Sequence, residues 1–191
     1  DIARALAPLV RAVTDAGIRR INGDLVGDES FFHGPPFGSG WAWDDMQFYY
    51  GAEVSALTIN DNRLEISVKP GAQVGAPCRL SVSPATGYLV LSNRSETVAK
   101  GSRRTIGFFR PLDQNVVYVL GKMPLGETNY ADDVTVPNPP SLFVSLLKEV
   151  LVKSGVKVTG RLRTANWLDR QARPLDEAKL LELGFVESSP M

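Results

Sequence analysis

Five apolar residues near the start of the chain recur at helical spacing: Ile2, Leu6, Leu9, Val10 and Val13. This spacing predicts an amphipathic helix over residues 2–16 that packs on a sheet. Asp1 can cap the first turn of this helix, and Gly17 can end it. Residues 18–26, with the sequence IRRINGDLV, have the pattern of a strand entered from the helix.

A second pattern has a period of two. Residues 54–59 and 63–69 both alternate apolar and polar side chains, and the polar triplet Asn60-Asp61-Asn62 separates them. Alternation on both sides of a short polar turn is typical of a β-hairpin. We therefore predict that these two segments pair with each other.

From residue 71 to residue 126 the pattern becomes a series of short β-like runs: CRLSVS, YLVLS, RTIGFF and VVYVLG. Turn signals separate these runs, at residues 84–87, 93–96 and 111–115. Short strands at regular spacing predict a small all-β unit.

After residue 126 the mixed pattern returns, with ADDVTV, a helix after Pro139-Pro140, and VKVTGRLR. The sequence therefore predicts an α+β fold in which helices pack on a mixed or antiparallel sheet, interrupted by a small all-β insertion. We place the α+β domain at residues 1–70 and 127–191, and the insertion at 71–126.

Composition and charge narrow the function. The chain has 191 residues, of which 43% are hydrophobic and 22% charged, as in a folded globular protein. Its 21 basic and 21 acidic residues cancel, which gives no reason to expect a nucleic acid or an anionic membrane as partner. We expect Arg103, Arg104 and Arg110 to lie on a solvated strand face. No apolar stretch is long enough for a transmembrane segment. Because the chain begins at Asp1, we expect that a preceding segment has been removed.

Cysteine and histidine chemistry is limited to one residue of each kind, Cys78 and His33. A single cysteine excludes an internal disulfide framework and a cysteine-based metal cluster. A serine–histidine–aspartate triad or a zinc site would have to use the one imidazole, in a glycine-rich loop. We therefore expect no metal and no cofactor.

Residues 145–155, SLLKEVLVKSG, contain a Ser-x-x-Lys motif typical of serine acyltransferases. On a helix, however, the apolar residues of this region fill one arc: Leu142, Phe143, Leu146, Leu147, Val150 and Leu151. Ser145 then falls on the opposite arc and is expected to face solvent in the middle of the helix. Lys153 and Gly155 match the last turn and the residue that ends the helix. We interpret this motif as structural.

Aromatic residues concentrate between residues 31 and 50, which hold eight of the sixteen: Phe31, Phe32, Phe37, Trp41, Trp43, Phe48, Tyr49 and Tyr50. We expect most of them to anchor a long loop to the core. The functional alternative is an aromatic wall beside a carboxylate, which suits a ligand with an apolar stem and a cationic end.

Several stretches together carry a resemblance to a known family: INGDLVGDESFF, SGWAWDDMQFYYGAEVSALTINDN, LGKMPLG, DDVTVPNPPSLFVSLLKEVLVKSGVKVTGRLR and VESSPM. In this order they resemble the region after the first catalytic motif of the class C penicillin-binding proteins, which are serine D-alanyl-D-alanine carboxypeptidases and endopeptidases. The resemblance covers nearly the whole chain. It favours a strand over residues 175–186, whereas LDEAKLLEL within them is helical by propensity, and both alternatives stay open.

The resemblance implies that the chain is the inserted, non-catalytic part of such a periplasmic or extracytoplasmic hydrolase. The Ser-x-x-Lys, Ser-x-Asn and Lys-Thr-Gly motifs would lie outside it, so no catalytic residue is expected here. The partners would be a peptidoglycan stem peptide and the catalytic domain of the same parent chain. In the family, the W-x-W-D-D-x-x-x-Y-Y-G segment reaches the substrate, so the resemblance implies that Trp41, Asp44 and Tyr49 bind it, with Asp45 able to replace Asp44.

A different class of function fits the same residues. The aromatic segment could belong to a stand-alone module that binds a glycan or a peptide. The coding sequence on either side of the chain would distinguish the two hypotheses, since only the peptidase requires the three catalytic motifs there.

Overall fold

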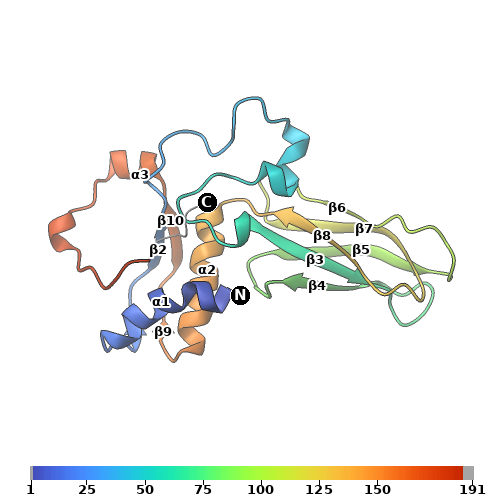
Figure 1. Ribbon diagram of the computed structural model, residues 1–191, viewed down its shortest axis with the longest axis horizontal. Coiled ribbons are helices and arrows are strands. Elements are labelled where there is room, and N and C mark those ends of the chain that lie inside the picture. Colours follow the sequence, from blue (N-terminus) through green and yellow to red (C-terminus); the bar gives the residue numbers. More distant parts are fainter. Residues whose placement is uncertain (1, 187–191) are drawn as a thin grey trace. The chain divides into compact units, whose positions relative to one another are not determined.

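The computed structural model describes residues 2–186 and has helices together with several small sheets, which confirms the predicted α+β fold (Figure 1). The chain divides into two compact units. The first contains residues 2–34, 55–59 and 140–186, and the second contains residues 35–54 and 60–139. Each unit is therefore built from segments that are distant in sequence.

The first unit combines helix α1 (Ile2–Asp15) and helix α2 (Pro139–Lys153) with two pairs of short parallel strands. Its hydrophobic core joins α1, α2 and these strands. The buried centre is formed by Val10, Leu151 and Val156. Partly buried residues pack around that centre: Val13, Ile21, Leu25, Leu147, Val150 and Val158. The apolar face of the first helix thus packs as its spacing predicts.

Two short strands replace the single strand expected at residues 18–26. Strand β1 (Arg20–Ile21) pairs with β9 (Lys157–Val158), and β2 (Leu25–Asp28) pairs with β10 (Leu162–Ala165). The break follows from a close approach of two backbones, because a Cβ at Gly160 would lie 2.1 Å from the carbonyl oxygen of Gly23. Regular pairing therefore stops between these strand pairs.

Both main helices end at the predicted glycines. Gly155 has a φ of +85°, and its amide donates to the carbonyl of Val152 while the amide of Val156 donates to that of Leu151. This is the Schellman arrangement, which needs a left-handed residue after the helix. Gly17, with a φ of +76°, ends α1 with the same pattern of bonds.

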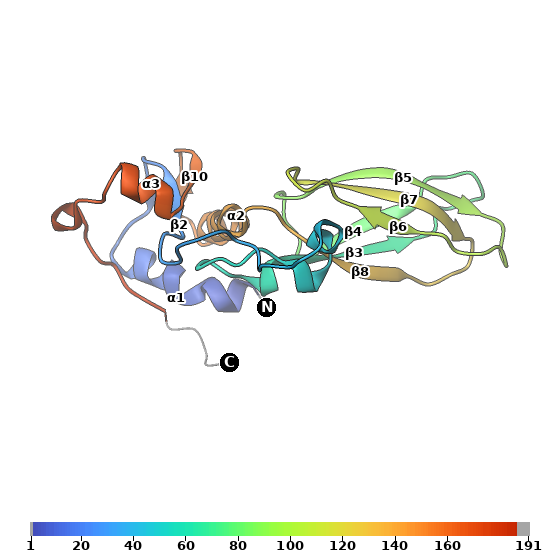
Figure 2. The same ribbon diagram turned by 90° about the horizontal axis from the view of Figure 1, so that it is seen from above.

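The second unit contains two three-stranded sheets, seen as separate layers in Figure 2. The antiparallel sheet has the order β4-β3-β8, with strands β4 (Arg79–Ser83), β3 (Arg63–Lys69) and β8 (Tyr130–Thr135). The mixed sheet has the order β5-β7-β6, with strands β5 (Val90–Val98), β7 (Val116–Pro124) and β6 (Gly107–Phe109). All four β-like runs of the middle region thus contribute strands.

The predicted hairpin between residues 54–59 and 63–69 is wrong. Residues 54–59 form no strand, and β3 pairs instead with β4 and β8. Asn60, Asp61 and Asn62 have φ values of 52°, 51° and 54°, so three left-handed residues in a row turn the chain away from a two-residue hairpin. Alternation in one segment could not reveal that its partner lies far along the chain.

The turn expected at residues 93–96 is also absent, because β5 continues through it to Val98. The polar side chain of Asn93, which suggested a turn, forms hydrogen bonds to backbone atoms instead. Asn93 donates from its side-chain amide to the carbonyl of Cys78 (2.7 Å) and accepts from the amide of Ser95 (3.1 Å). Asn93 meanwhile stays in register with Val119 of β7.

The sheet β4-β3-β8 spans the expected boundaries of the insertion at residues 71–126, because β4 lies inside those bounds while β3 and β8 lie outside them. The last register pair of β3 and β8 joins Val68 to Tyr130. The two ends of segment 71–126 are therefore close together, as the ends of an inserted segment must be. Its extent as an insertion stays a prediction.

The last part of the chain contains one helix that the sequence analysis did not predict. Helix α3 (Trp167–Ala172) begins with a capping box in which Asn166 and Asp169 bond to each other's backbone amides.

Within residues 175–186 the structure has only one 3₁₀ turn, η4 (Glu177–Lys179). Of the resemblance stretch VESSPM, residues 187–191 lie outside the described residues.

Candidate functional site

The C-terminal part of the aromatic segment (residues 31–50) folds as two consecutive 3₁₀ turns of the second unit, η1 (Trp43–Gln47) and η2 (Tyr49–Gly51), whereas residues 31–34 belong to the first unit. A Cβ at position 51 would lie 2.2 Å from the carbonyl oxygen of Asp45. Only glycine therefore allows the second turn to fold back against the first.

Arg110 holds this segment against the β-sheets. Its guanidinium Nη2 donates to the carbonyl of Met46 (2.6 Å), which also accepts from the Thr135 hydroxyl (2.6 Å). The backbone amide of Arg110 donates to the side-chain oxygen of Gln47 (3.3 Å). These hydrogen bonds thus attach η1 to Arg110, just after β6, and to Thr135 of β8.

The solvated position expected for Arg110 is wrong, because only 4% of the residue is exposed. Burial lowers the pKa of Arg110 from its ordinary value, and nearby Glu53 opposes this effect. The guanidinium stays charged at neutral pH and forms further hydrogen bonds to the carbonyls of Pro111 and Leu112. Buried cations need such partners to compensate for lost water.

The aromatic side chains do not anchor the segment to the core, contrary to the main sequence expectation. All eight are exposed: Phe31, Phe32, Phe37, Trp41, Trp43, Phe48, Tyr49 and Tyr50. The exposed fraction is 37% for Trp41 and 62% for Tyr49. Because Arg110 anchors η1 by polar bonds, the rings of η1 and of the adjacent η2 remain available at the surface.

The two neighbouring carboxylates differ in their surroundings. Partial burial and a hydrogen bond to the Asp45 carboxylate raise the pKa of Tyr50, so Asp45 is already engaged. Asp44 is exposed and, within residues 2–186, has no hydrogen-bond or ion-pair partner for its carboxylate. Tyr49 lies beside a cation, with the Arg63 guanidinium carbon 5.9 Å from its ring centre.

The structure thus places Trp41, Asp44 and Tyr49 in one short segment, with exposed rings and one unpaired carboxylate. It records no direct contact among the three side chains of this described segment. The arrangement can accept a cation at Asp44 and an apolar stem along a ring.

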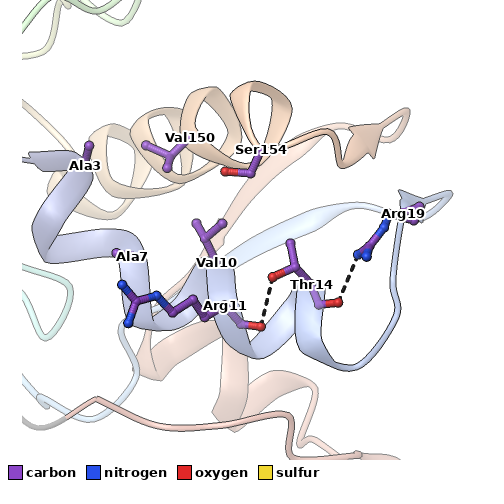
Figure 3. Close-up of a pocket in the computed structure, with 8 residues that line it drawn as sticks. All are labelled: Ala3, Ala7, Val10, Arg11, Thr14, Arg19, Val150 and Ser154. Atoms are coloured by element: carbon purple, nitrogen blue, oxygen red, sulfur yellow. Dashed lines mark hydrogen bonds between the residues drawn. The ribbon is translucent and has the colours of Figure 1, made fainter.

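Neither Ser145 nor Ser154, which begins a second Ser-x-x-Lys sequence ending at Lys157, lies in a catalytic arrangement within the described residues. Ser145 is half-buried rather than solvent-facing and, within residues 2–186, makes no side-chain hydrogen bond to Lys148. Ser154 lines a groove of about 560 Å³ between α1 and α2 (Figure 3). The other lining residues are Ala3, Ala7, Val10, Arg11, Thr14, Arg19 and Val150. None of them can act as a general base for a serine nucleophile.

The single histidine is also in a structural position. The His33 ring stacks on Trp167, with 5.6 Å between ring centres, and the Trp167 indole donates to the carbonyl of Gly34 (3.3 Å). Among the described residues, no group of three or more His, Cys, Asp or Glu side chains could hold a metal ion. No helix of the described part is long and apolar enough to cross a membrane.

Comparison with known proteins identifies the family. The model of the D-Ala-D-Ala carboxypeptidase 3 (S13) family matches residues 3–183. The chain belongs to this family. Its predicted membership among the class C penicillin-binding proteins is thereby confirmed.

Relatives of this S13-family chain are considerably longer. A D-alanyl-D-alanine carboxypeptidase of Actinomadura sp. (strain R39) is 31% identical over 179 residues, which are 88% of this chain and 33% of the relative. The D-alanyl-D-alanine carboxypeptidase DacB of Haemophilus influenzae is 30% identical over 89 residues, 43% of this chain and 19% of the relative. The S13-family chain therefore spans about a third or less of the curated relatives that it matches.

Solved structures share the fold. Penicillin-binding protein 4 (dacB) of Haemophilus influenzae aligns with a TM-score of 0.70 at 20% identity, over 85% of this chain and 36% of that one. A second structure of that protein, in complex with a β-lactam, aligns with a TM-score of 0.57 at 16% identity, over 86% of this chain and 34% of that one. The S13-family chain thus has the fold of part of a larger protein.

Proposed function

We propose that this chain is an accessory, non-catalytic region of a serine-type D-alanyl-D-alanine carboxypeptidase or endopeptidase that acts on peptidoglycan stem peptides. Family membership and the names of the curated relatives support the reaction. The described residues that line the groove at Ser154 include no general base, which supports a non-catalytic role. The catalytic domain of the same parent chain would be its partner, and the enzyme would work in the periplasm or another extracytoplasmic space.

Its contribution would be one wall of the substrate site, formed by Trp41, Asp44 and Tyr49. The observation that carries this proposal is the contrast between Asp44, which is exposed and unpaired among the described residues, and Asp45, which Tyr50 engages. A stem peptide with a free ammonium on its diamino acid would pair with Asp44, while the rings cover its aliphatic part. A substrate without that charge would leave the carboxylate desolvated and unpaired.

The experiment compares Asp44→Asn with Asp45→Asn in the longer peptidase, using two substrates. One is a stem peptide with a free side-chain ammonium, and the other is a simple D-Ala-D-Ala ester without it. We expect Asp44→Asn to lower kcat/KM at least about tenfold for the stem peptide, because a charge-assisted hydrogen bond is lost. Cleavage of the ester should stay unchanged.

The control variant should behave differently, because Asp45 is engaged by Tyr50 and not by substrate. Asp45→Asn should have a smaller effect on the stem peptide than Asp44→Asn. If Asp44→Asn impaired both substrates equally, the segment would have a structural role and the proposed specificity would be wrong.

A stand-alone glycan- or peptide-binding module remains the second candidate, and the exposure of the six rings between residues 37 and 50, all in the second unit, favours it. The coding sequence around the chain decides between the two. The three catalytic motifs, in order on both sides of the chain, support the peptidase, and their absence supports the module.

A further inference from the structure

A cavity of about 210 Å³ lies in the second unit, where the edge strands of its two sheets meet the aromatic segment. Strand β8 is an edge of one sheet and β6 is an edge of the other. Phe48 of the aromatic segment, Phe108 of β6 and Tyr130 of β8 contribute to its wall. The rings of Phe108 and Tyr130 are 5.8 Å apart between centres.

Asp132 of β8 lies at a position where the alternation of the strand would place a core residue. Asp132 is in register with Ile66, and Tyr130 with Val68, and both of these β3 partners are fully buried. Directly opposite residues share one face of a sheet. Asp132 therefore lies on the inner face of its sheet. Because β8 is an edge strand, Asp132 is nevertheless exposed to solvent, and it lines the cavity.

The two neighbouring acidic residues of β8 differ in their ion pairing. Asp133 forms an ion pair with Arg63 at 2.5 Å. Asp132 accepts only from the Tyr130 hydroxyl (3.2 Å) and the backbone amide of Asp133 (2.9 Å), and no cation of residues 2–186 lies within ion-pair distance of it. An ionised carboxylate can accept more hydrogen bonds than these two. Asp132 thus has no ion-pair partner among the described residues and keeps free accepting capacity.

Tyr130 lies between the Asp132 carboxylate and a cation, Arg104. Partial burial and the Asp132 carboxylate raise the pKa of Tyr130, while Arg104 opposes this effect. The guanidinium carbon of Arg104 lies 4.6 Å from the centre of the Tyr130 ring, outside the cavity lining. The ring therefore already accepts one cation on its surface.

We propose that this cavity binds the cationic end of an amino-acid side chain. Asp132 would pair with the ammonium or guanidinium, while Phe108 and Tyr130 would pack against the aliphatic stem. The volume is smaller than the roughly 300–1,000 Å³ of pockets that enclose whole ligands, and it suits a single side chain. This second cation site is independent of Asp44 and does not rest on the proposed function.

The test titrates the whole chain with small probes and follows the amide signals of Phe108, Tyr130 and Asp132 by NMR. The cationic probes are Nα-acetyl-lysine methylamide and Nα-acetyl-arginine methylamide, which also distinguish the two cation types. The neutral probe is Nα-acetyl-norleucine methylamide. We expect saturable shifts at these residues with at least one cationic probe and not with the neutral one.

Two variants distinguish a specific ion pair with Asp132 from a general effect of the negative charge of the protein. Asp132→Asn should raise the Kd of the cationic probe at least about tenfold, because a charged hydrogen bond is lost. Glu96→Gln, which removes one exposed charge from the other sheet, should leave it unchanged. Phe108→Leu provides a second measurement if the first variant fails to fold, and it should also weaken binding.

The competing explanation is that Asp132 only protects the sheet edge against pairing with another chain. In that case Asp132→Asn would promote self-association without changing probe binding. Equal shifts with the neutral probe, an unchanged Kd in Asp132→Asn, or shifts confined to the residues around Asp44 would each overturn the proposal. The last result would leave the proposed role of Asp44 intact.

Discussion

Arg110 shows how one buried side chain determines what a nearby surface can do. Its hydrogen bond to Met46 joins residues 64 positions apart, and its bond to Thr135 (3.1 Å) spans 25 positions. Because these partners are distant in sequence, no local pattern could identify Arg110 as an anchor. The polar attachment leaves the aromatic rings free at the surface, where a hydrophobic attachment would have buried them.

At this scale we predict that Arg110→Met destabilises the chain by about 2–4 kcal/mol, because it removes the donors from three partly buried carbonyl oxygens and from the buried Thr135 hydroxyl. Urea denaturation measures this change. Arg94→Met, at an exposed position of β5, is the matched control and should lie within about 0.5 kcal/mol of wild type. Equal stability of the two variants would show that Arg110 is no anchor.

Some helices and strands depend on residues close in sequence, and others depend on residues far along the chain. Helices α1 and α2 could be predicted, since apolar spacing and the terminal glycines are local signals. The pairing of β3 with β8 could not, because its register depends on residues more than sixty positions away. The break between β1 and β2 likewise depends on the contact of Gly160 with Gly23.

Packing of β2 against α2 gives a prediction for Gly27. A Cβ there would lie 2.8 Å from a methyl group of Val144 and 3.1 Å from the carbonyl oxygen of Pro140. We expect Gly27→Ala to lower the free energy of unfolding by about 1–3 kcal/mol through overpacking. Gly23→Ala, which meets no atom within 4 Å, should change it by about 1 kcal/mol or less. Thermal unfolding compares the two, and similar Tm values would contradict this packing.

An ion pair joins α3 to β2 and predicts a pH dependence. Arg170 donates to Asp28 at 2.6 Å, and both side chains are about three-quarters buried. Burial alone would raise the pKa of Asp28, but hydrogen bonds from Ser30 and Arg170 outweigh it, and the pKa is lowered from 3.8. The stabilisation is therefore present above pH 3.8 and is lost as the pH falls through the lower pKa of the folded state.

We predict that Arg170→Met costs about 1 kcal/mol near neutral pH and that this difference from wild type shrinks below about pH 3.8. Chemical denaturation across a pH series measures it. Arg173→Met, at an exposed position just after α3, should show no such dependence. A destabilisation by Arg170→Met that is constant with pH would show that packing, and not the ion pair, explains its effect.

For the whole molecule, the sequence could predict the α+β fold and the family, because several long stretches preserve a family pattern in order. It could also point to Trp41, Asp44 and Tyr49, but only by that likeness. It could not distinguish Asp44 from Asp45, since the difference arises from the Tyr50 hydroxyl. The sequence also could not predict the cavity at Asp132, because the cavity forms where edge strands of two sheets meet.

The central claim is that these 191 residues contribute to a peptidase without containing its nucleophile. Incubation of the chain with a fluorescent penicillin, followed by denaturing electrophoresis and intact-mass measurement, tests it most directly. A longer S13-family peptidase with all three catalytic motifs serves as the positive control. We predict covalent labelling of the control and none of this chain, whereas acylation at Ser145 or Ser154 would contradict the account.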